Sequence, residues 1–182
     1  MLLGMTRFRY LILSFALLSF CPSARSQVRA FATQSIEQLK AGIEDKHPSA
    51  FYALAAKLFE SGKKDEAVLW FYIGQIRYRV FLRSSGKGID RGSESRTFSS
   101  LSDQIGTTID RYAFGDIPVL IKTIDEALNW DDVHRNGFTS KQQFKEQYDL
   151  IRARLKRMED EILQKSAMIK QQRTQAGLDN RE

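Results

Sequence analysis

The residues that could carry out catalysis are few and widely spaced in this sequence. The histidines are His47 and His134, and the single cysteine, Cys21, lies in an apolar N-terminal stretch. No nucleophile or carboxylate is paired with His47 along the sequence, so we interpret it as an exposed N-terminal cap of the helix that follows. Motifs of the Gly-x-Ser-x-Gly and His-Glu-x-x-His types are absent, and nucleophilic and zinc chemistry therefore lack their usual groups.

Two pairs of acidic residues are the remaining candidates for acid–base chemistry. Asp125 precedes Glu126, and Asp131 precedes Asp132. Neighbouring residues on a helix point in different directions, so neither pair converges on a substrate as a glycosidase requires. We expect solvated helix faces here, no enzymatic activity, no catalytic residue and no cofactor.

Two segments have the outline of ion- or phosphate-binding loops. Residues 132–143 resemble a calcium-binding EF-hand loop, but His134 takes a position that needs a hard oxygen and Gln143 replaces the bidentate glutamate. We expect an Asn-Gly turn at Asn136 and no metal site. Residues 84–87 lack the Gly-x-x-x-x-Gly-Lys-Ser/Thr spacing of a phosphate loop, which predicts a solvated basic loop that continues to residue 96.

The first 26 residues follow the pattern of a secretory signal peptide. Arg7 and Arg9 precede an apolar run at 11–20, and small residues lead up to Ser26, which predicts cleavage before Gln27. An apolar run of about ten residues is too short for a permanent membrane anchor, which needs roughly 20. We therefore expect a periplasmic or secreted protein.

Export determines two further expectations. Lipidation at Cys21 is the weaker alternative, because the bulky Phe20 precedes it. Cleavage after Ser26 leaves the mature chain without a cysteine, so its fold cannot depend on a disulfide. Cleavage removes three arginines and no acidic residue, so the formal net charge falls from +6 to +3. The case for nucleic-acid binding weakens accordingly.

The mature chain is long enough for one domain, expected at residues 27–170.

Residues 48–82 predict a helical hairpin, around which the rest of the chain is organised. Apolar residues recur at steps of three and four on both sides of a Gly-Lys-Lys-Asp turn. Gly62 supplies a left-handed cap for the first helix, and Asp65 opens the second. The second helix is apolar over more than one stripe, so it needs several neighbours.

This hairpin resembles a tetratricopeptide (TPR) or Sel1-like repeat. The pattern of large, small and turn residues is matched by Phe51, Leu54, Ala55, Leu58, Gly62, Ala67, Phe71 and Gly74. The run EAVLWFYIGQ is similar to the ending of a Sel1-like repeat. The closing proline of a TPR and a second copy of the repeat are both missing, so the resemblance implies a solitary hairpin. Such modules bind other proteins, and the resemblance implies the same role here.

Shorter helices are expected on both sides of the hairpin. After a leader at 27–34 without periodicity, Ser35 opens a helix with a capping box. Beyond the loop, another helix starts near Ser99, and Asp116 caps the next one, which ends near the core residue Trp130.

The last helix, expected at 140–170 with Thr139 or Ser140 as its cap, carries a heptad seam. Phe144, Tyr148, Ile151, Leu155, Met158 and Ile162 alternate at steps of four and three, and Ile169 continues the phase. We expect its second half to project, to form a homodimer or to meet a partner, and we expect residues 171–182 to be disordered.

These features predict an all-α bundle and a non-enzymatic, exported protein-binding module, such as an immunity protein or an envelope adaptor. The candidate partner-binding residues are Trp70, Tyr72, Ile73, Tyr148, Ile151, Leu155, Met158 and Ile162. Two alternatives stay open. One is a structural homo-oligomer formed through the C-terminal helix, and the other is a small-molecule or lipid carrier with a pocket lined by Trp70, Phe71, Tyr72 and Trp130.

Overall fold

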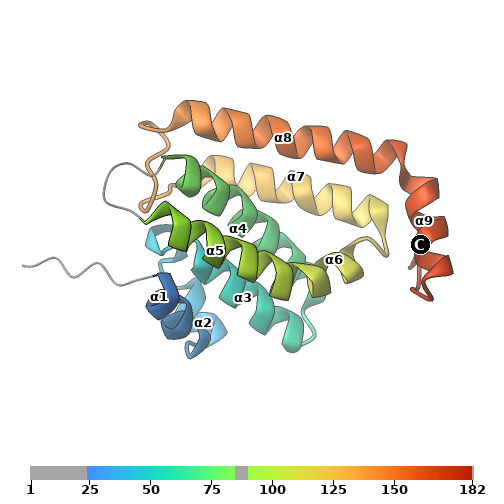
Figure 1. Cartoon of the computed structure of the whole chain (residues 1–182), viewed down its shortest axis with the longest axis horizontal. Coiled ribbons are helices and arrows are strands. Elements are labelled where there is room, and N and C mark those ends of the chain that lie inside the picture. Colours follow the sequence, from blue (N-terminus) through green and yellow to red (C-terminus); the bar gives the residue numbers. More distant parts are fainter. Residues whose placement is uncertain (1–23, 85–89, 182) are drawn as a thin grey trace, which may run out of the picture.

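The structure is a computed structural model that describes residues 24–84 and 90–181 (Figure 1). In these ranges all regular elements are helical, which confirms the all-α prediction. The elements are α1 Ala24–Ala32, α2 Ile36–Lys40, the 3-10 turn η1 Ile43–Asp45, α3 Ser49–Glu60, α4 Lys64–Ser84, α5 Arg91–Leu101, the π-helical segment η2 Ser102–Gly106, α6 Thr107–Ala113, α7 Ile117–Val133, α8 Lys145–Gln164 and α9 Ser166–Gln175. Among the described helices, none combines the length and apolarity needed to span a bilayer. Cys21 and the rest of the predicted signal peptide up to residue 23 lie outside the described residues.

The predicted hairpin is formed by α3 and α4. Gly62 adopts a positive φ of 83°, and the N–H of Lys63 donates to the carbonyl of Leu58 at 2.9 Å, which caps α3 as a left-handed glycine does. The helices approach closely at Gly74, where a Cβ atom would lie only 2.9 Å from the Cβ of Phe51. The two helices can therefore pack this closely only if residue 74 has no side chain.

Helix α4 lies at the centre of the bundle (Figure 1). It packs against α3, against α5 and α6, and against α7 and α8, while α1 and α2 cover α3. Most of its residues are consequently buried: Ala67, Val68, Phe71, Tyr72, Ile73, Gly74, Gln75, Ile76, Arg77, Tyr78, Val80 and Phe81. The apolar circumference seen in the sequence is thus covered by the chain itself.

The predicted helix starts at Ser35 and Asp116 are confirmed. The hydroxyl of Ser35 accepts from the N–H of Gln38 at 3.2 Å in a complete capping box, and Asp116 Oδ1 accepts from the N–H of Val119 at 3.1 Å. These caps are local features, and local sequence was enough to predict them.

Two segments expected to be irregular are helical instead. The leader at 27–34 belongs largely to α1, whose Val28 and Phe31 pack against the core. The predicted loop to residue 96 gives way to α5 at Arg91, because Asp90 Oδ1 caps the N–H of Ser93 at 3.1 Å. Serine and glycine are weak helix formers, and contacts with the core outweigh that weakness here.

The C-terminal helix is shorter than expected and is broken. It begins at Lys145 rather than at 140, and it ends before Lys165, whose φ and ψ are −99° and 8°. The chain then turns into α9 instead of projecting (Figure 1), which brings Ile169 against the core. The predicted disordered tail is ordered up to residue 181, where the N–H of Arg181 donates to the carbonyl of Gly115 at 2.6 Å.

A buried ion pair joins α4 to α7. Arg77 is 1% exposed and Asp131 is fully buried, with Arg77 Nε 3.0 Å from Asp131 Oδ1. The guanidinium carbon of Arg77 lies 5.2 Å from the ring centre of Phe51 and 4.9 Å from that of Trp130. The other carboxylate oxygen faces Arg152 of α8 at 3.5 Å. One carboxylate thus fixes α4, α7 and α8 relative to one another.

We predict that Asp131→Asn lowers the free energy of unfolding by about 3–5 kcal/mol, because it leaves the Arg77 guanidinium buried without a counter-charge. Urea unfolding at pH 7 measures this loss. The matched control is Asp149→Asn, which removes an exposed pair with Lys145 on one helix face and should cost less than about 1 kcal/mol. Equal losses in the two variants would contradict the assigned role.

Candidate functional site

The predicted partner-binding residues lie mainly in the interior. Tyr72, Ile73, Tyr148, Ile151, Leu155 and Ile162 are each 6% exposed or less, whereas Trp70 and Met158 are partly exposed. The heptad seam packs against α4 and α7, so these six residues do not form the exposed apolar ridge that the sequence led us to expect. A binding role for Trp70 and Met158 stays a prediction.

The aromatic residues assigned to a carrier pocket pack against one another and against the core. Trp70 meets Trp130 edge-on with ring centres 5.2 Å apart, and Phe71 meets Tyr52 in the same way at 5.5 Å. Tyr72 is 5% exposed. Trp70 and Trp130 pack between α4 and α7, while Phe71 and Tyr72 face η2 and α6, so these rings do not line a common pocket of the kind the carrier alternative assumed.

A hydrogen-bonded group around His47 is the constellation that the sequence did not reveal. His47 is 4% exposed, not an exposed cap, and its Nδ1 lies 2.8 Å from the hydroxyl of Ser49. Its Nε2 lies 3.4 Å from Glu94 Oε2, which also accepts from the hydroxyl of Tyr78 at 2.7 Å. The hydroxyl of Ser49, the imidazole of His47 and the carboxylate of Glu94 therefore lie in a row in space, as the corresponding groups do in hydrolytic triads.

The burial of this group indicates a structural role. Ser49 is 2% exposed, and its backbone N–H also donates to His47 Nδ1 at 3.2 Å, so the ring caps the first turn of α3. Burial by itself raises the pKa of Glu94, but the nearby imidazole of His47 and the hydrogen bond from Tyr78 outweigh it and hold this pKa below its usual value. The group ties α5 to the start of α3.

A second polar group surrounds the π-helical segment η2. Tyr72 donates to Asp110 Oδ1 at a long 3.5 Å, and Gln75 Nε2 donates to Ser102 Oγ at 3.3 Å. Burial raises the pKa of Asp110 to about 6, a shift that the hydrogen bond from Tyr72 and the charge of Arg79 only partly offset. π-Helical segments occur frequently at functional sites, and Asp110 lies on α6, one turn after this one ends.

The segment with the outline of a calcium loop is an asparagine turn. Asn136 Oδ1 accepts from the N–H groups of Phe138 and Thr139 at 3.1 and 2.9 Å, and its Nδ2 donates to the hydroxyl of Tyr148 at 2.7 Å. The oxygen that would coordinate a cation is thus engaged in local structure. In the described part of the chain, no three His, Cys, Asp or Glu side chains are grouped to hold a metal ion.

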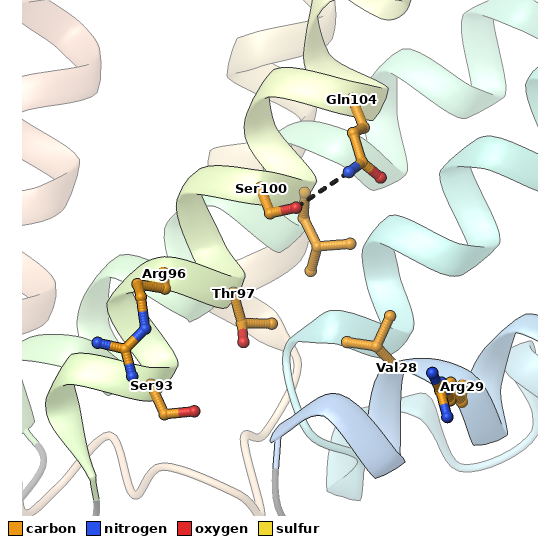
Figure 2. Close-up of a pocket in the computed structure, with 8 residues that line it drawn as sticks. Val28, Arg29, Ser93, Arg96, Thr97, Ser100 and Gln104 are labelled. Carbon is orange, nitrogen blue, oxygen red and sulfur yellow. Dashed lines mark hydrogen bonds between the residues drawn. The ribbon is translucent and has the colours of Figure 1, made fainter.

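A groove between α1 and α5 brings several polar groups together (Figure 2). It encloses about 410 Å³. Both helices contribute its lining: Val28 and Arg29 from α1, and Ser93, Arg96, Thr97, Ser100 and Leu101 from α5, with Gln104 from η2. Among the side chains drawn in Figure 2, Gln104 Nε2 donates to Ser100 Oγ at 3.1 Å.

The polar residues of this groove follow from the helical period of α5. Ser93, Thr97 and Ser100 recur at steps of four and three and therefore share one face, while Glu94 and Leu101 turn toward the core. Arg29 and Arg96 are exposed at the rim. The groove thus offers hydroxyl and amide groups beside two positive charges. It could not be predicted from local sequence patterns, because its two walls are about 65 residues apart.

Comparisons with known proteins give a limited result. No protein family matches this sequence, and no solved structure matches it. An uncharacterised protein of Haemophilus influenzae is 29% identical over 87 residues, which is 48% of this chain and 33% of that protein. The chain therefore spans about a third of the length of this relative, which contributes no functional assignment.

We predict that Asp110→Asn stabilises the protein at pH 7 and not at low pH. The folded pKa of about 6 exceeds the ordinary 3.8, so the folded state binds the proton more tightly and stability falls as the pH rises from about 4 to about 6. The variant should gain about 1–3 kcal/mol in unfolding free energy at pH 7 and about nothing near pH 3. Asp103→Asn, which alters an exposed acid of the preceding segment η2, is the control for urea unfolding at both pH values. A destabilised Asp110→Asn at pH 7 would contradict this account.

Proposed function

We propose that this chain is a non-enzymatic protein-binding module whose contact surface is the groove between α1 and α5. The observation that supports this most is the face of Ser93, Thr97 and Ser100, which leaves hydroxyl groups in a cavity of about 410 Å³. The groups that could do acid–base or nucleophilic chemistry lie elsewhere, and His47 and Ser49 are nearly inaccessible. Polar, concave and non-reactive surfaces suit recognition.

The chemistry of the groove indicates the kind of segment it accepts. Serine and threonine hydroxyls and the amide of Gln104 serve as donors and as acceptors, so they match a peptide backbone. Arg29 and Arg96 at the rim favour a carboxylate on that segment, since guanidinium groups pair with carboxylates through two parallel hydrogen bonds. Val28 and the buried Leu101 supply the apolar contact. We therefore propose an extended acidic segment of a partner protein as the occupant.

The resemblance of α3 and α4 to a TPR or Sel1-like hairpin supports the same class of function. In arrays of such repeats, neighbouring helices leave a surface for partners. In this chain α1 and α2 cover the hairpin, and the open surface lies between α1 and α5. An immunity protein that blocks a toxin and an envelope adaptor remain the finer proposals within this class.

The alternative of a homo-oligomer through the C-terminal helix receives less support. The seam of α8 that would mediate self-association is packed on α4 and α7 in the same chain. The outward face of α8 is rich in charged side chains, including Arg154, Arg157 and Glu161, which are exposed. Leu150 and Leu163 are also exposed on α8, but they lie near its two ends, and the charged residues between them leave no continuous apolar core of the kind that stable dimer interfaces have.

Site-specific photocrosslinking tests the groove. A photoreactive residue at Thr97, introduced in cells that naturally produce the protein, should give one discrete adduct, because the partner segment lies within reach. The same residue at Lys122, which is exposed on α7, should give none. Adding Arg96→Glu should remove the Thr97 adduct by repelling the acidic segment. Equal adducts at the two positions, or none at Thr97, would refute the assignment of the groove.

Export is proposed on the pattern of residues 1–26 and has its own test. We expect the protein isolated from its native cells to begin at Gln27, and N-terminal sequencing or intact-mass measurement reports this directly. Recovery in the periplasmic or secreted fraction should accompany the shortened N-terminus. A chain that retains Met1 and stays in the cytoplasm would overturn the proposal of export while leaving the groove unaffected.

A further inference from the structure

A cleft with an excess of positive charge lies at the end of the bundle where α6 and the C-terminal segment meet, far from α1 (Figure 1). It encloses about 430 Å³. Its lining contains four cations and one carboxylate, together with apolar and aromatic groups: Lys64, Arg111, Arg173, Arg181, Asp179, Phe59, Tyr112, Leu178 and Thr108. These residues come from the hairpin, from α6 and from the C-terminal segment, so only the folded chain assembles them.

The ring of Tyr112 forms the floor and organises the cations around it. The guanidinium carbon of Arg181 lies 3.5 Å from the ring centre, and Lys64 Nζ lies 5.3 Å from it. The hydroxyl of Tyr112 donates to Asp65 Oδ1 at 2.8 Å, so this carboxylate of the hairpin already has a hydrogen-bond partner. A guanidinium stacked on an aromatic face keeps in-plane N–H donors for a further acceptor.

Arg173 holds the C-terminal wall of the cleft in place. Its Nη1 donates to the carbonyl of Arg111 at 2.9 Å, and its Nη2 donates to the carbonyl of Asp179 at 2.7 Å. Burial, followed by the charges of Arg181 and Arg111, lowers the pKa of Arg173. Like charges are therefore brought together here at a cost in energy, and Arg173 is a positioning residue because its donors are already used.

The cations of this cleft differ from most others on the surface. Lys40, Lys122, Arg135, Lys145, Lys156 and Lys165 each form an ion pair with a nearby carboxylate. Across the described residues, none of the ion pairs includes Lys64, Arg111, Arg173 or Arg181. Three of them, Lys64, Arg111 and Arg181, line the same concave surface.

We propose that this cleft binds a phosphate-bearing ligand, held by Lys64, Arg111 and Arg181 over the ring of Tyr112. A phosphate group carries close to two negative charges at pH 7 and three acceptor oxygens, which match three converging cationic donors. The ligand neutralises charge that the protein leaves uncompensated. A monocarboxylate supplies half of that charge and fewer acceptors.

Calorimetric titration of the purified protein with pyrophosphate at low salt tests the site. We expect binding by the wild type and an affinity at least about tenfold weaker in the double variant Lys64→Gln, Arg111→Gln, because each lost charge-assisted hydrogen bond contributes enough for such a factor. The control Lys122→Gln, Lys145→Gln removes the same charge from exposed helix faces and should bind as the wild type does. All four side chains are exposed, so folding is not at issue.

A second arm identifies the source of the phosphate. Co-sedimentation with vesicles of phosphatidylglycerol and phosphatidylcholine, compared with phosphatidylcholine alone, reports binding to a lipid headgroup. Binding to both pyrophosphate and the anionic vesicles, lost in the cleft variant alone, supports the site with a lipid as source, and binding to pyrophosphate alone supports a soluble ligand. Failure of the wild type to bind either probe, or equal weakening in the cleft and control variants, would overturn the proposal. The groove between α1 and α5 shares no residue with this test.

Discussion

The buried pair of Arg77 and Asp131 is the constraint on which the rest of the structure depends. Its two charges are almost completely withdrawn from water, so each requires the other, and the energy lost if they separate is large. The pair fixes the register of α4 against α7, and Arg152 extends it to α8. Arg77 also donates to the carbonyl of Arg135 at 2.8 Å, which holds the segment between α7 and α8 against the same centre. Because burying both charges itself costs free energy, the main effect of such a pair is to select one packing of the helices rather than to add net stability.

What the sequence could predict was the structure that depends on near neighbours. The hairpin, its glycine turn at Gly62, and the caps at Ser35 and Asp116 all arise from residues within one helical turn of one another. The structure that depends on distant residues was not predictable in the same way. His47 and Glu94 are 47 positions apart, and the serine-rich α5 is helical because Glu94 and Phe98 reach the core formed by α3 and α4. Periodicity predicts which face of a helix is buried, but it does not predict which distant residue pairs with a buried charge.

The same limit explains why six of the eight candidate binding residues lie in the interior. Large apolar residues at helical spacing are what a core and an interface have in common, so the seam of Tyr148, Ile151 and Leu155 fits both readings. The choice between them depends on whether the chain itself supplies a cover, and α4 and α7 do so. The groove and the cleft mix polar and apolar groups, and each is assembled from segments distant in the sequence, as with Arg29 and Thr97.

The hydroxyl and charged groups of the groove and the cleft recognise a ligand by other means than an apolar surface does. Hydroxyl and charged groups gain little from burying area, and they discriminate by matching donors to acceptors and by long-range attraction. The groove and the cleft adjoin along η2 and α6, where Gln104 lines the groove and Thr108 lines the cleft. On α4 the corresponding residues are far apart: Lys64 belongs to the cleft, and Tyr78, which holds Glu94 behind the groove, lies about 21 Å away at ~1.5 Å per residue. Because α4 is anchored on both sides by Arg77 and the hairpin packing, this separation is fixed by the core. In the two proposals made above, an acidic protein segment and a phosphate group use different positive charges, Arg29 and Arg96 for the segment and Lys64, Arg111 and Arg181 for the phosphate.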